Sequence, residues 1–223
     1  MPKLRVHNLA ISPDGYAAGP DQDIENPLGQ GGLGLHEWVF ETRVWNRMQG
    51  SDGGQELPDE GLDDTFIIEG DADIGATIMG RNMFGPVRGA WEDETWTGWW
   101  GDEPPYHHPV FVLTHHPRDP VLMAGGTTFH FVTDGIEAAL ERAMEAANGQ
   151  DVAIGRGAET AQQYLRARLV GEMVVHVVPT LLGGGSRLFD NVDGGLSGYR
   201  CTGLVSSPAA AHYTYAAEPA EDS

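Results

Sequence analysis

A glycine turn between two apolar segments is the feature of this chain best suited to chemistry. Val152-Ala153-Ile154 is long enough for a buried strand, Gly155-Arg156-Gly157 follows it, and Ala158-Glu159-Thr160 opens a segment whose apolar residues have helical spacing. The first amides of a helix have no partner within the helix, and the helix dipole adds partial positive charge there. Because glycines also let the backbone approach a ligand closely, this turn predicts a binding site for a phosphate or diphosphate.

The glycine turn matches neither of two well-known phosphate-binding motifs. The dinucleotide motif G-x-G-x-x-G requires a third glycine, but Ala158-Glu159-Thr160 follows the turn. A P-loop requires Gly-Lys-Ser or Gly-Lys-Thr after its glycines, and the chain lacks that sequence here. An ordinary turn between a strand and a helix therefore explains the local pattern as well as an anion site does.

Two further groups of polar residues come at the ends of expected strands. Gly80-Arg81-Asn82-Met83 follows the apolar residues that end at position 79, and Thr114-His115 follows the apolar run that begins at Val110. Ligands of open α/β sheets bind outside the carboxyl ends of the strands. An arginine placed there can hold an anion through two parallel hydrogen bonds. A binding role for Arg81 and an arginine on the surface without a ligand both fit this position.

The histidine pairs of this chain are poor candidates for a metal site. His107 and His108 are adjacent, as are His115 and His116, and adjacent residues of a strand point to opposite faces. Neither pair can easily chelate one ion. The single cysteine, Cys201, excludes an internal disulfide and a zinc–cysteine cluster. We therefore expect no metal.

Alternating strand and helix patterns predict the elements that must position these residues. Strands are expected over residues 4–11, 76–79, 110–114, 129–132, 152–154 and 173–178, and helices over residues 36–48, 63–73, 134–147 and 158–169. Residues 199–206 and 210–217 alternate on either side of Ser207-Pro208, which predicts an antiparallel hairpin. The sequence therefore predicts an α/β fold with a largely parallel sheet, in which residues 152–154 and 173–178 are neighbouring strands. Asp134 is expected to cap its helix.

Long segments without periodicity separate some of these elements. Residues 21–34 and the acidic, glycine-rich residues 50–61 are expected loops. Residues 85–109 form another loop, which holds four tryptophans: Trp91, Trp96, Trp99 and Trp100. Such a loop can order as the rim of an active site or as a dimer interface, and both readings stay open. We expect a homodimer.

Composition limits the classes of partner. The 223 residues contain 33 acids and 13 bases, for a net charge of −20. Nucleic acid and anionic membranes both require clustered positive charge, so neither is an expected partner. The chain has no run of about 18 apolar residues and its first residues lack the apolar core of a signal peptide. We expect a cytoplasmic protein that acts on a small-molecule substrate.

Several motifs, taken in order, resemble one known family. They are Ser12 to Gly19 (SPDGYAAG), Ile78 to Phe84 (IMGRNMF), Pro109 to Thr114 (PVFVLT), Gly125 to Phe129 (GGTTF) and Asp151 to Phe189. These segments resemble the dihydrofolate-reductase-like family, in the branch that includes the reductase half of the riboflavin-biosynthesis deaminase/reductase. The resemblance extends from Leu4 to about Tyr215.

This resemblance implies a three-layer dihydrofolate-reductase-like fold and an NADPH-dependent reductase. By resemblance, Arg81 faces the adenosine 2′-phosphate, and Asp14 is a catalytic residue in the loop over nicotinamide and substrate. The implied cofactor-binding residues are Gly80, Arg81, Asn82, Met83, Thr114, His115, Gly155, Arg156, Gly157, Ala158, Glu159 and Thr160. The implied substrate is a pyrimidine ribosylamine phosphate, 5-amino-6-(5-phosphoribosylamino)uracil. The chain has no H-x-E with C-x-x-C, so the zinc deaminase site of the bifunctional enzymes is not expected.

The family usually has two adjacent glycines where Arg156 interrupts the pair in this chain. The paired-glycine geometry is therefore displaced by one residue or relaxed, and the arginine side chain can also reach a phosphate. Two other functions stay open: a reductase of the same fold acting on another substrate, such as a dihydrofolate-like pterin, and an NADP-binding oligomeric protein without turnover. Glu37 and Glu41 lie where dihydrofolate reductases place an acid, but their surroundings do not match that motif. We expect one domain over residues 1–217 and an acidic tail over residues 218–223.

Overall fold

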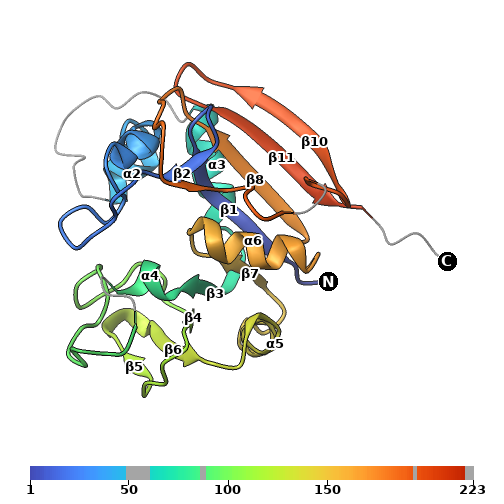
Figure 1. Cartoon of the computed structure of the whole chain (residues 1–223). Coiled ribbons are helices and arrows are strands. Elements are labelled where there is room, and N and C mark those ends of the chain that lie inside the picture. The colour runs from blue at the N-terminus through green and yellow to red at the C-terminus, as the bar shows by residue number, and fades with distance from the viewer. Residues whose placement is uncertain (49–60, 86–88, 193–194, 219–223) are drawn as a thin grey trace.

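The computed structural model describes residues 1–48, 61–85, 89–192 and 195–218. Most of the expected loop over residues 50–61 and of the acidic tail lies outside these ranges. Within them, one sheet has nine strands in the order β10-β11-β8-β1-β7-β3-β4-β6-β5. Figure 1 shows the hairpin β10–β11 at one edge of this sheet and β5 at the other.

The centre of the sheet is parallel, as the alternating pattern predicts. Its parallel strands are β1 (Leu4–Ile11), β3 (Ile74–Gly80), β4 (Pro109–Leu113), β6 (Thr128–Val132), β7 (Asp151–Ile154) and β8 (Glu172–Val177). Antiparallel strands complete both edges: β10 (Tyr199–Ser206) with β11 (Ala211–Ala217), and the short β5 (Val121–Leu122). A separate antiparallel pair joins β2 (Tyr16–Ala18) to β9 (Ser186–Arg187). The mostly parallel sheet and its final hairpin are confirmed.

The expectation that residues 152–154 and 173–178 form neighbouring strands is wrong. Strand β1 lies between them, with Leu4 opposite Val152 of β7 and Arg5 opposite Glu172 of β8. The local strand–helix–strand pattern correctly gives the parallel direction of β7 and β8. It cannot reveal that a strand from the start of the chain fills the gap, because that pairing joins residues far apart in sequence.

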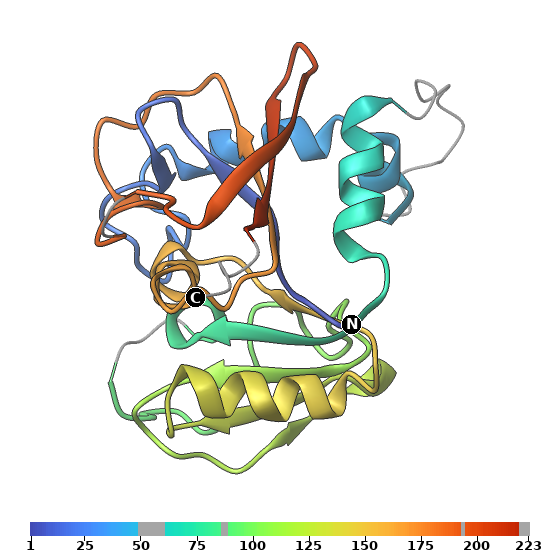
Figure 2. The same ribbon diagram turned by 90° about the vertical axis from the view of Figure 1, so that its right-hand side faces the viewer.

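Helices cover both faces of the sheet. Helices α5 (Ile136–Ala146) and α6 (Ala158–Arg166) pack on one face, where Ala139, Ala143 and Tyr164 are fully buried against β1, β3 and β7. Figure 2 shows α5, in yellow, lying along the strands of the lower half of the sheet. On the other face, α1 (Glu37–Phe40), α2 (Arg43–Met48) and α3 (Leu62–Asp71) pack around Trp38, Ala10 and Val178. This is the expected three-layer arrangement.

Three short helices complete the regular elements of the described chain. A 3₁₀-helix, η1 (Gly32–His36), precedes α1, and α4 (Arg81–Phe84) follows β3 directly. A second 3₁₀-helix, η2 (Ala124–Gly126), lies before β6. Among the described residues, no helix is long and apolar enough to cross a membrane.

Two helix expectations need correction. The expected helix over residues 36–48 is divided, because the Thr42 hydroxyl donates to the Val39 carbonyl at 2.6 Å and accepts from the Trp45 amide at 3.3 Å. Such local hydrogen bonds compete with a continuous helix. Asp134 does not cap α5; the helix begins after Gly135, which has φ 94°, and Asp134 instead pairs with Arg142 at 2.6 Å. Sequence spacing alone could not distinguish these two partners for the carboxylate.

Candidate active site

A cavity of about 630 Å³ opens at the carboxyl ends of the central parallel strands. Strands β1, β3 and β4 reach it through Leu9, Gly80 and Leu113, and α6 reaches it through its first residues. Its walls combine apolar and aromatic side chains with a few polar groups, which is typical of a small-molecule site. Of the sequence-predicted residues, the structure brings these together around the cavity: Gly80, Arg81, Asn82, Met83, Thr114, His115, Arg156, Gly157, Ala158, Glu159 and Thr160.

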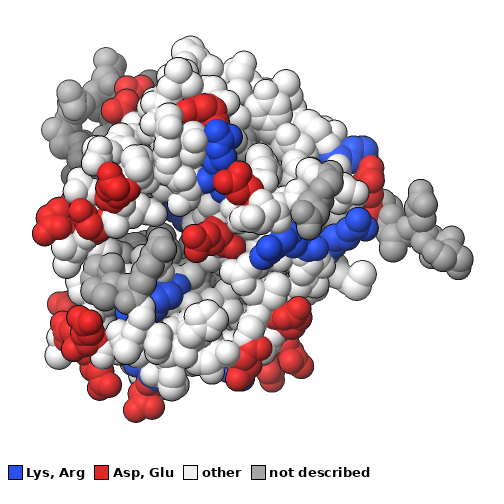
Figure 3. Space-filling model, viewed as in Figure 1, with Lys and Arg blue, Asp and Glu red and all other residues white. Residues whose placement is uncertain are grey.

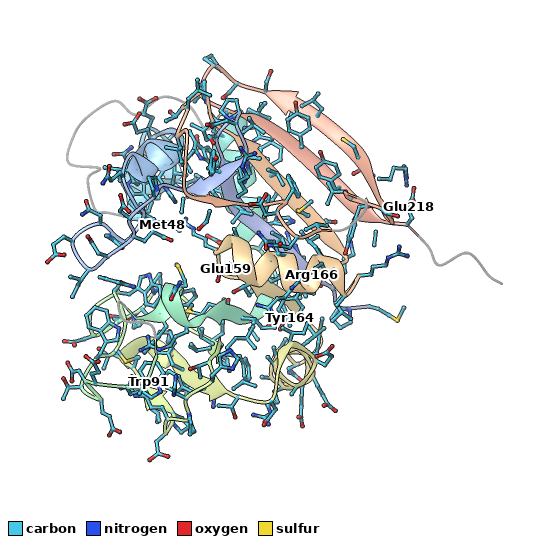
Figure 4. The ribbon with its side chains drawn as sticks, in the orientation of Figure 1. Met48, Trp91, Glu159, Tyr164, Arg166 and Glu218 are labelled. Atoms are coloured by element: carbon cyan, nitrogen blue, oxygen red, sulfur yellow. The ribbon has the colours of Figure 1, made fainter. Side chains whose placement is uncertain are left out.

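The amino-terminal end of α6 provides backbone donors to the cavity. Ala158, Glu159 and Thr160 form its first turn, where amides have no acceptor within the helix, and all three line the cavity. Figure 4 shows Glu159 at this end of α6, with Arg166 at the opposite end. An anion at this end would meet both these amides and the positive end of the helix dipole.

Two of the predicted glycines serve packing within the protein. A Cβ atom at Gly155 would lie 2.8 Å from Cγ2 of Thr77, and one at Gly80 would lie 2.6 Å from Oγ1 of Thr160. Any larger residue would therefore force β3, β7 and α6 apart. Gly80 also lines the cavity, whereas Gly155 is not among the lining residues. A direct contact of Gly155 with a ligand stays a prediction.

Arg81 lies in an aromatic environment with unsatisfied donors. Its guanidinium carbon is 3.6 Å from the centre of the Trp91 ring, a cation–π geometry. Its Nε and Nη1 atoms are buried and have no hydrogen-bond partner among the described residues. Burial, and then the charge of Arg118, lower the pKa of Arg81. A buried cation that lacks hydrogen bonds is costly, so an anion would relieve this arrangement.

Arg118 is a second cation at the same aromatic cluster. Its guanidinium carbon lies 4.9 Å from the Trp91 ring centre and 5.1 Å from that of Phe131, and its Nη1 atom is buried without a partner among the described residues. Figure 4 shows Trp91 in the half of the molecule that holds α4. Nothing in the sequence singled out Arg118, because only the fold brings its loop beside Arg81.

The positive groups near the cavity stand out on an acidic protein. In Figure 3, Asp and Glu side chains are scattered over the face shown, whereas Lys and Arg form a few separate patches. With a net charge of −20, the protein repels free anions at long range. Anion binding therefore depends on local donors such as those of Arg81 and α6.

Arg156 and His36 line another part of the cavity wall. Burial is the main cause that lowers the pKa of Arg156, and the charges of Tyr106 and Asp71 act in the opposite sense. The Nδ1 atom of His36 lies 3.3 Å from the Gly32 carbonyl oxygen. Burial, and then the charge of Arg156, lower the pKa of His36 to about 4, so this imidazole is neutral near pH 7. No sequence pattern singled out His36, since a lone histidine before a helix is common.

Asp14 is not among the residues that line the cavity. Its carboxylate accepts hydrogen bonds from the backbone amides of Gly183 at 2.7 Å and Leu182 at 3.4 Å. A hydrogen bond with the Ser12 side chain is the main cause that lowers the pKa of Asp14. The carboxylate thus joins two loops, while Ala17 and Ala18 further along the same segment reach the cavity. A direct catalytic role for Asp14 stays a prediction.

The side chains of His107 and His108 contact other groups of the protein. His107 contacts the Gly125 carbonyl at 2.9 Å through Nδ1, and His108 contacts Oγ1 of Thr77 at 2.8 Å through Nε2. No group of three or more His, Cys, Asp or Glu side chains among the described residues has the geometry to hold a metal ion.

Comparisons with known proteins agree with this geometry. The family model of the RibD C-terminal domain matches residues 2–203. A riboflavin biosynthesis protein from Shewanella sp. PV-4, described as putative in its own name, has a similar structure with a TM-score of 0.59 at 22% identity, covering 98% of this chain and 100% of that one. Among curated proteins, none matches this chain.

Two further solved structures share the fold. Dihydrofolate reductase from Enterococcus faecalis, complexed with NADP(H) and RAB-propyl, has a TM-score of 0.52 at 15% identity over 97% of both chains. A diaminohydroxyphosphoribosylaminopyrimidine deaminase/5-amino-6-(5-phosphoribosylamino)uracil reductase from Thermotoga maritima has a TM-score of 0.53 at 10% identity, covering 97% of this chain and 56% of that one. The chain therefore belongs to the RibD C-terminal domain family, a reductase-like domain with the fold of dihydrofolate reductase.

Proposed function

We propose that this protein is an NADPH-dependent reductase whose substrate is 5-amino-6-(5-phosphoribosylamino)uracil or a close relative. The observation that carries the proposal is the pair of anion-binding features at one cavity. The first turn of α6 offers free amides, and Arg81 offers buried donors without partners. Membership of the RibD C-terminal domain family supports a reductase, and the Thermotoga maritima neighbour names the substrate class.

The residues present suit a phosphorylated dinucleotide. In this proposal the amides of Ala158, Glu159 and Thr160 hold the diphosphate, and Arg81 holds the 2′-phosphate that distinguishes NADPH from NADH. Bound NADPH would supply the hydride. Residues of the chain would orient the cofactor and the substrate and exclude water from them. The indole rings of Trp99 and Trp100 form part of the cavity wall and would contribute to the exclusion of water.

Selectivity between the two cofactors tests this assignment. A charge-assisted contact to a phosphate contributes about 1.5–3 kcal/mol, or roughly ten- to a hundredfold in affinity. We expect Arg81→Ala to weaken NADPH binding by that factor and to leave NADH binding nearly unchanged, as measured by titration calorimetry. Arg166→Ala, at the far end of α6, is the matched control. Equal losses for NADPH and NADH would show that Arg81 supports the fold and would contradict its role in selectivity.

Turnover separates the proposed function from its alternatives. The purified protein should consume NADPH when 5-amino-6-(5-phosphoribosylamino)uracil is added. The loss of NADPH absorbance measures this consumption. A dihydrofolate-like pterin should be assayed in parallel. Turnover with the pterin alone would assign another substrate, and tight NADPH binding without turnover on either would favour a binding protein.

A further inference from the structure

The guanidinium of Arg81 is enclosed in a way that limits how an anion can reach it. Its Nε and Nη1 atoms are buried, and neither has a hydrogen-bond partner among the described residues. A phosphate or carboxylate binds a guanidinium through two parallel N–H donors, taken either from Nε and Nη2 or from both Nη atoms. Each of these pairs includes one of the enclosed nitrogen atoms of Arg81. Two-point binding of an anion therefore requires a change around Arg81.

The indole ring of Trp91 forms one side of this enclosure. The guanidinium carbon of Arg81 lies 3.6 Å from the centre of the ring, which is a close cation–π contact. Gly85 and Trp96 lie on another side, because a Cβ atom at Gly85 would clash with Nη1 of Arg81 and lie 3.1 Å from Nε1 of Trp96. The guanidinium thus lies against the end of α4, with the ring of Trp91 over one of its faces.

The same ring also contacts the second arginine of this cluster. The guanidinium carbon of Arg118 lies 4.9 Å from the Trp91 ring centre, and its Nη1 atom is buried without a partner among the described residues. An aromatic ring attracts a cation, but an oxyanion that donates no proton and accepts two hydrogen bonds attracts it more strongly in a site without water. An anion that displaced Trp91 would meet donors of both arginines.

Trp91 is held by few contacts. The residue, labelled in Figure 4, lies in a segment without helix or strand, residues 89–108, between α4 and β4. Its ring is half-buried, and its Nε1 atom donates to the His116 carbonyl at 2.9 Å. The ring also makes edge contacts with Phe84 and Phe131, with ring centres 5.8 Å and 5.0 Å apart. A side chain in an irregular segment leaves such contacts at a lower cost than one inside a helix or strand.

We propose that Trp91 competes with the anionic group of the ligand for the guanidinium of Arg81, and so sets the preference between phosphorylated and unphosphorylated cofactors. This inference rests on the proposed function, in which Arg81 binds the 2′-phosphate of NADPH. In the closed state Arg81 stacks on Trp91, and in the open state this stack is broken and the guanidinium offers two donors to the phosphate. NADH has no 2′-phosphate and does not need the open state. Trp91 therefore lowers the affinity for NADPH and leaves that for NADH unchanged.

A different role for the indole predicts the opposite effect of its removal. A ring that stays on Arg81 in the complex would orient the guanidinium towards the phosphate, and its loss would weaken NADPH binding. The burial of Nε and Nη1 favours competition, because a guanidinium oriented for two-point binding would leave one of its donor pairs accessible.

Removal of the indole distinguishes the two roles by the sign of the change. We expect Trp91→Ala to bind NADPH and adenosine 2′-monophosphate about fivefold more tightly than wild type, and NADH with unchanged affinity, in titration calorimetry. Trp91→Phe keeps a smaller aromatic ring and should show a smaller gain, which preserves the test if the alanine variant does not fold. Trp45→Ala is the matched control, because it removes a half-buried tryptophan that contacts Phe40 in another part of the molecule. It should leave all three affinities unchanged.

Arg81→Ala separates a failure of this inference from a failure of the proposed function. If Arg81→Ala weakens the binding of adenosine 2′-monophosphate but neither Trp91 variant strengthens it, Arg81 holds the phosphate and the competition is overturned. If Arg81→Ala leaves that binding unchanged, the assignment of Arg81 to the 2′-phosphate fails, and the competition fails with it.

Tryptophan fluorescence gives a second measurement of the same competition. Saturation with adenosine 2′-monophosphate should change the emission of the wild-type protein, because the Trp91 ring loses its contact with a cation. Trp91→Phe should lack this change. An equal change of emission in both proteins would show that Trp91 stays in place when the phosphate binds, and would overturn the proposal.

Discussion

Arginines lie near both ends of the parallel sheet, and their surroundings differ. Arg5, in β1, is 8% exposed and donates to the carbonyls of Glu69 at 2.7 Å and Ala72 at 2.9 Å, at the end of α3. It also lies 3.6 Å from a carboxylate oxygen of Asp151 and 3.7 Å from one of Glu172. At the carboxyl ends of the strands, Arg81 has buried nitrogen atoms without partners in the described structure.

This difference separates a structural cation from a binding one. Arg5 compensates its lost hydration with carbonyls and carboxylates of the protein, and it fixes the end of α3 against β1. Arg81 is partly withdrawn from water as well, but described residues supply no partners for its Nε and Nη1 atoms. The carboxyl ends of parallel strands are where α/β proteins bind ligands, so the missing partners are expected to be groups of a ligand.

Removing Arg5 should produce the largest loss of stability. Arg5→Met leaves the last carbonyls of α3 and the carboxylates of Asp151 and Glu172 without their partner, and we expect a loss of about 3 kcal/mol in the free energy of unfolding. Urea denaturation measures it, with Arg81→Met as the matched variant, for which we expect little loss. If Arg81→Met destabilises the protein as much as Arg5→Met does, the proposed difference between a structural Arg5 and a ligand-binding Arg81 is wrong.

Low pH should reduce the stability of the fold through His7, which lies in β1. Burial is the main cause that lowers the pKa of His7 from 6.5 to about 4, and its Nε2 lies 3.0 Å from Oε1 of Glu172. Because the unfolded chain takes up the proton first, the stability from neutral His7 is complete above pH 6.5 and is lost as the pH falls towards 4.

Stability measured at two pH values isolates that contribution. Between pH 7 and about pH 5 we expect His7 to account for a loss of about 2 kcal/mol, and His7→Gln should remove that part of the pH dependence. Urea titrations of both proteins at each pH provide the comparison. Equal pH dependence in wild type and variant would mean that His7 binds its proton equally in both states.

Asp14 should show the smallest effect on stability. Its segment reaches the cavity, yet its carboxylate already has hydrogen-bond partners in the protein, as Arg5 does. We expect Asp14→Ala to leave the free energy of unfolding nearly unchanged, because the carboxylate is accessible to water. If the predicted catalytic role holds, kcat/KM for the true substrate should fall about fivefold with NADPH affinity intact. Loss of NADPH binding would instead show that the contact with Gly183 shapes the cofactor site.

Local sequence patterns determined most of the elements and the edge at which the site forms. Apolar runs such as Met173–Val178, which His176 alone interrupts, indicated the parallel strands, and the alternation after Tyr199 indicated the final hairpin, because both patterns depend only on side-chain periodicity. The positions of Arg81, Thr114 and Gly157 just after strands placed them at one edge, because parallel strands end on the same side.

The tertiary structure alone decided which residues meet. It inserted β1 between β7 and β8, placed Trp91 under the Arg81 guanidinium, and brought Arg118 and His36 beside residues distant in sequence. It also gave Arg5 its partners and left the Nε and Nη1 atoms of Arg81 without one among the described residues. Periodicity describes neighbours along the chain, whereas the satisfaction of a buried charge depends on groups that only the packed fold brings within hydrogen-bond distance.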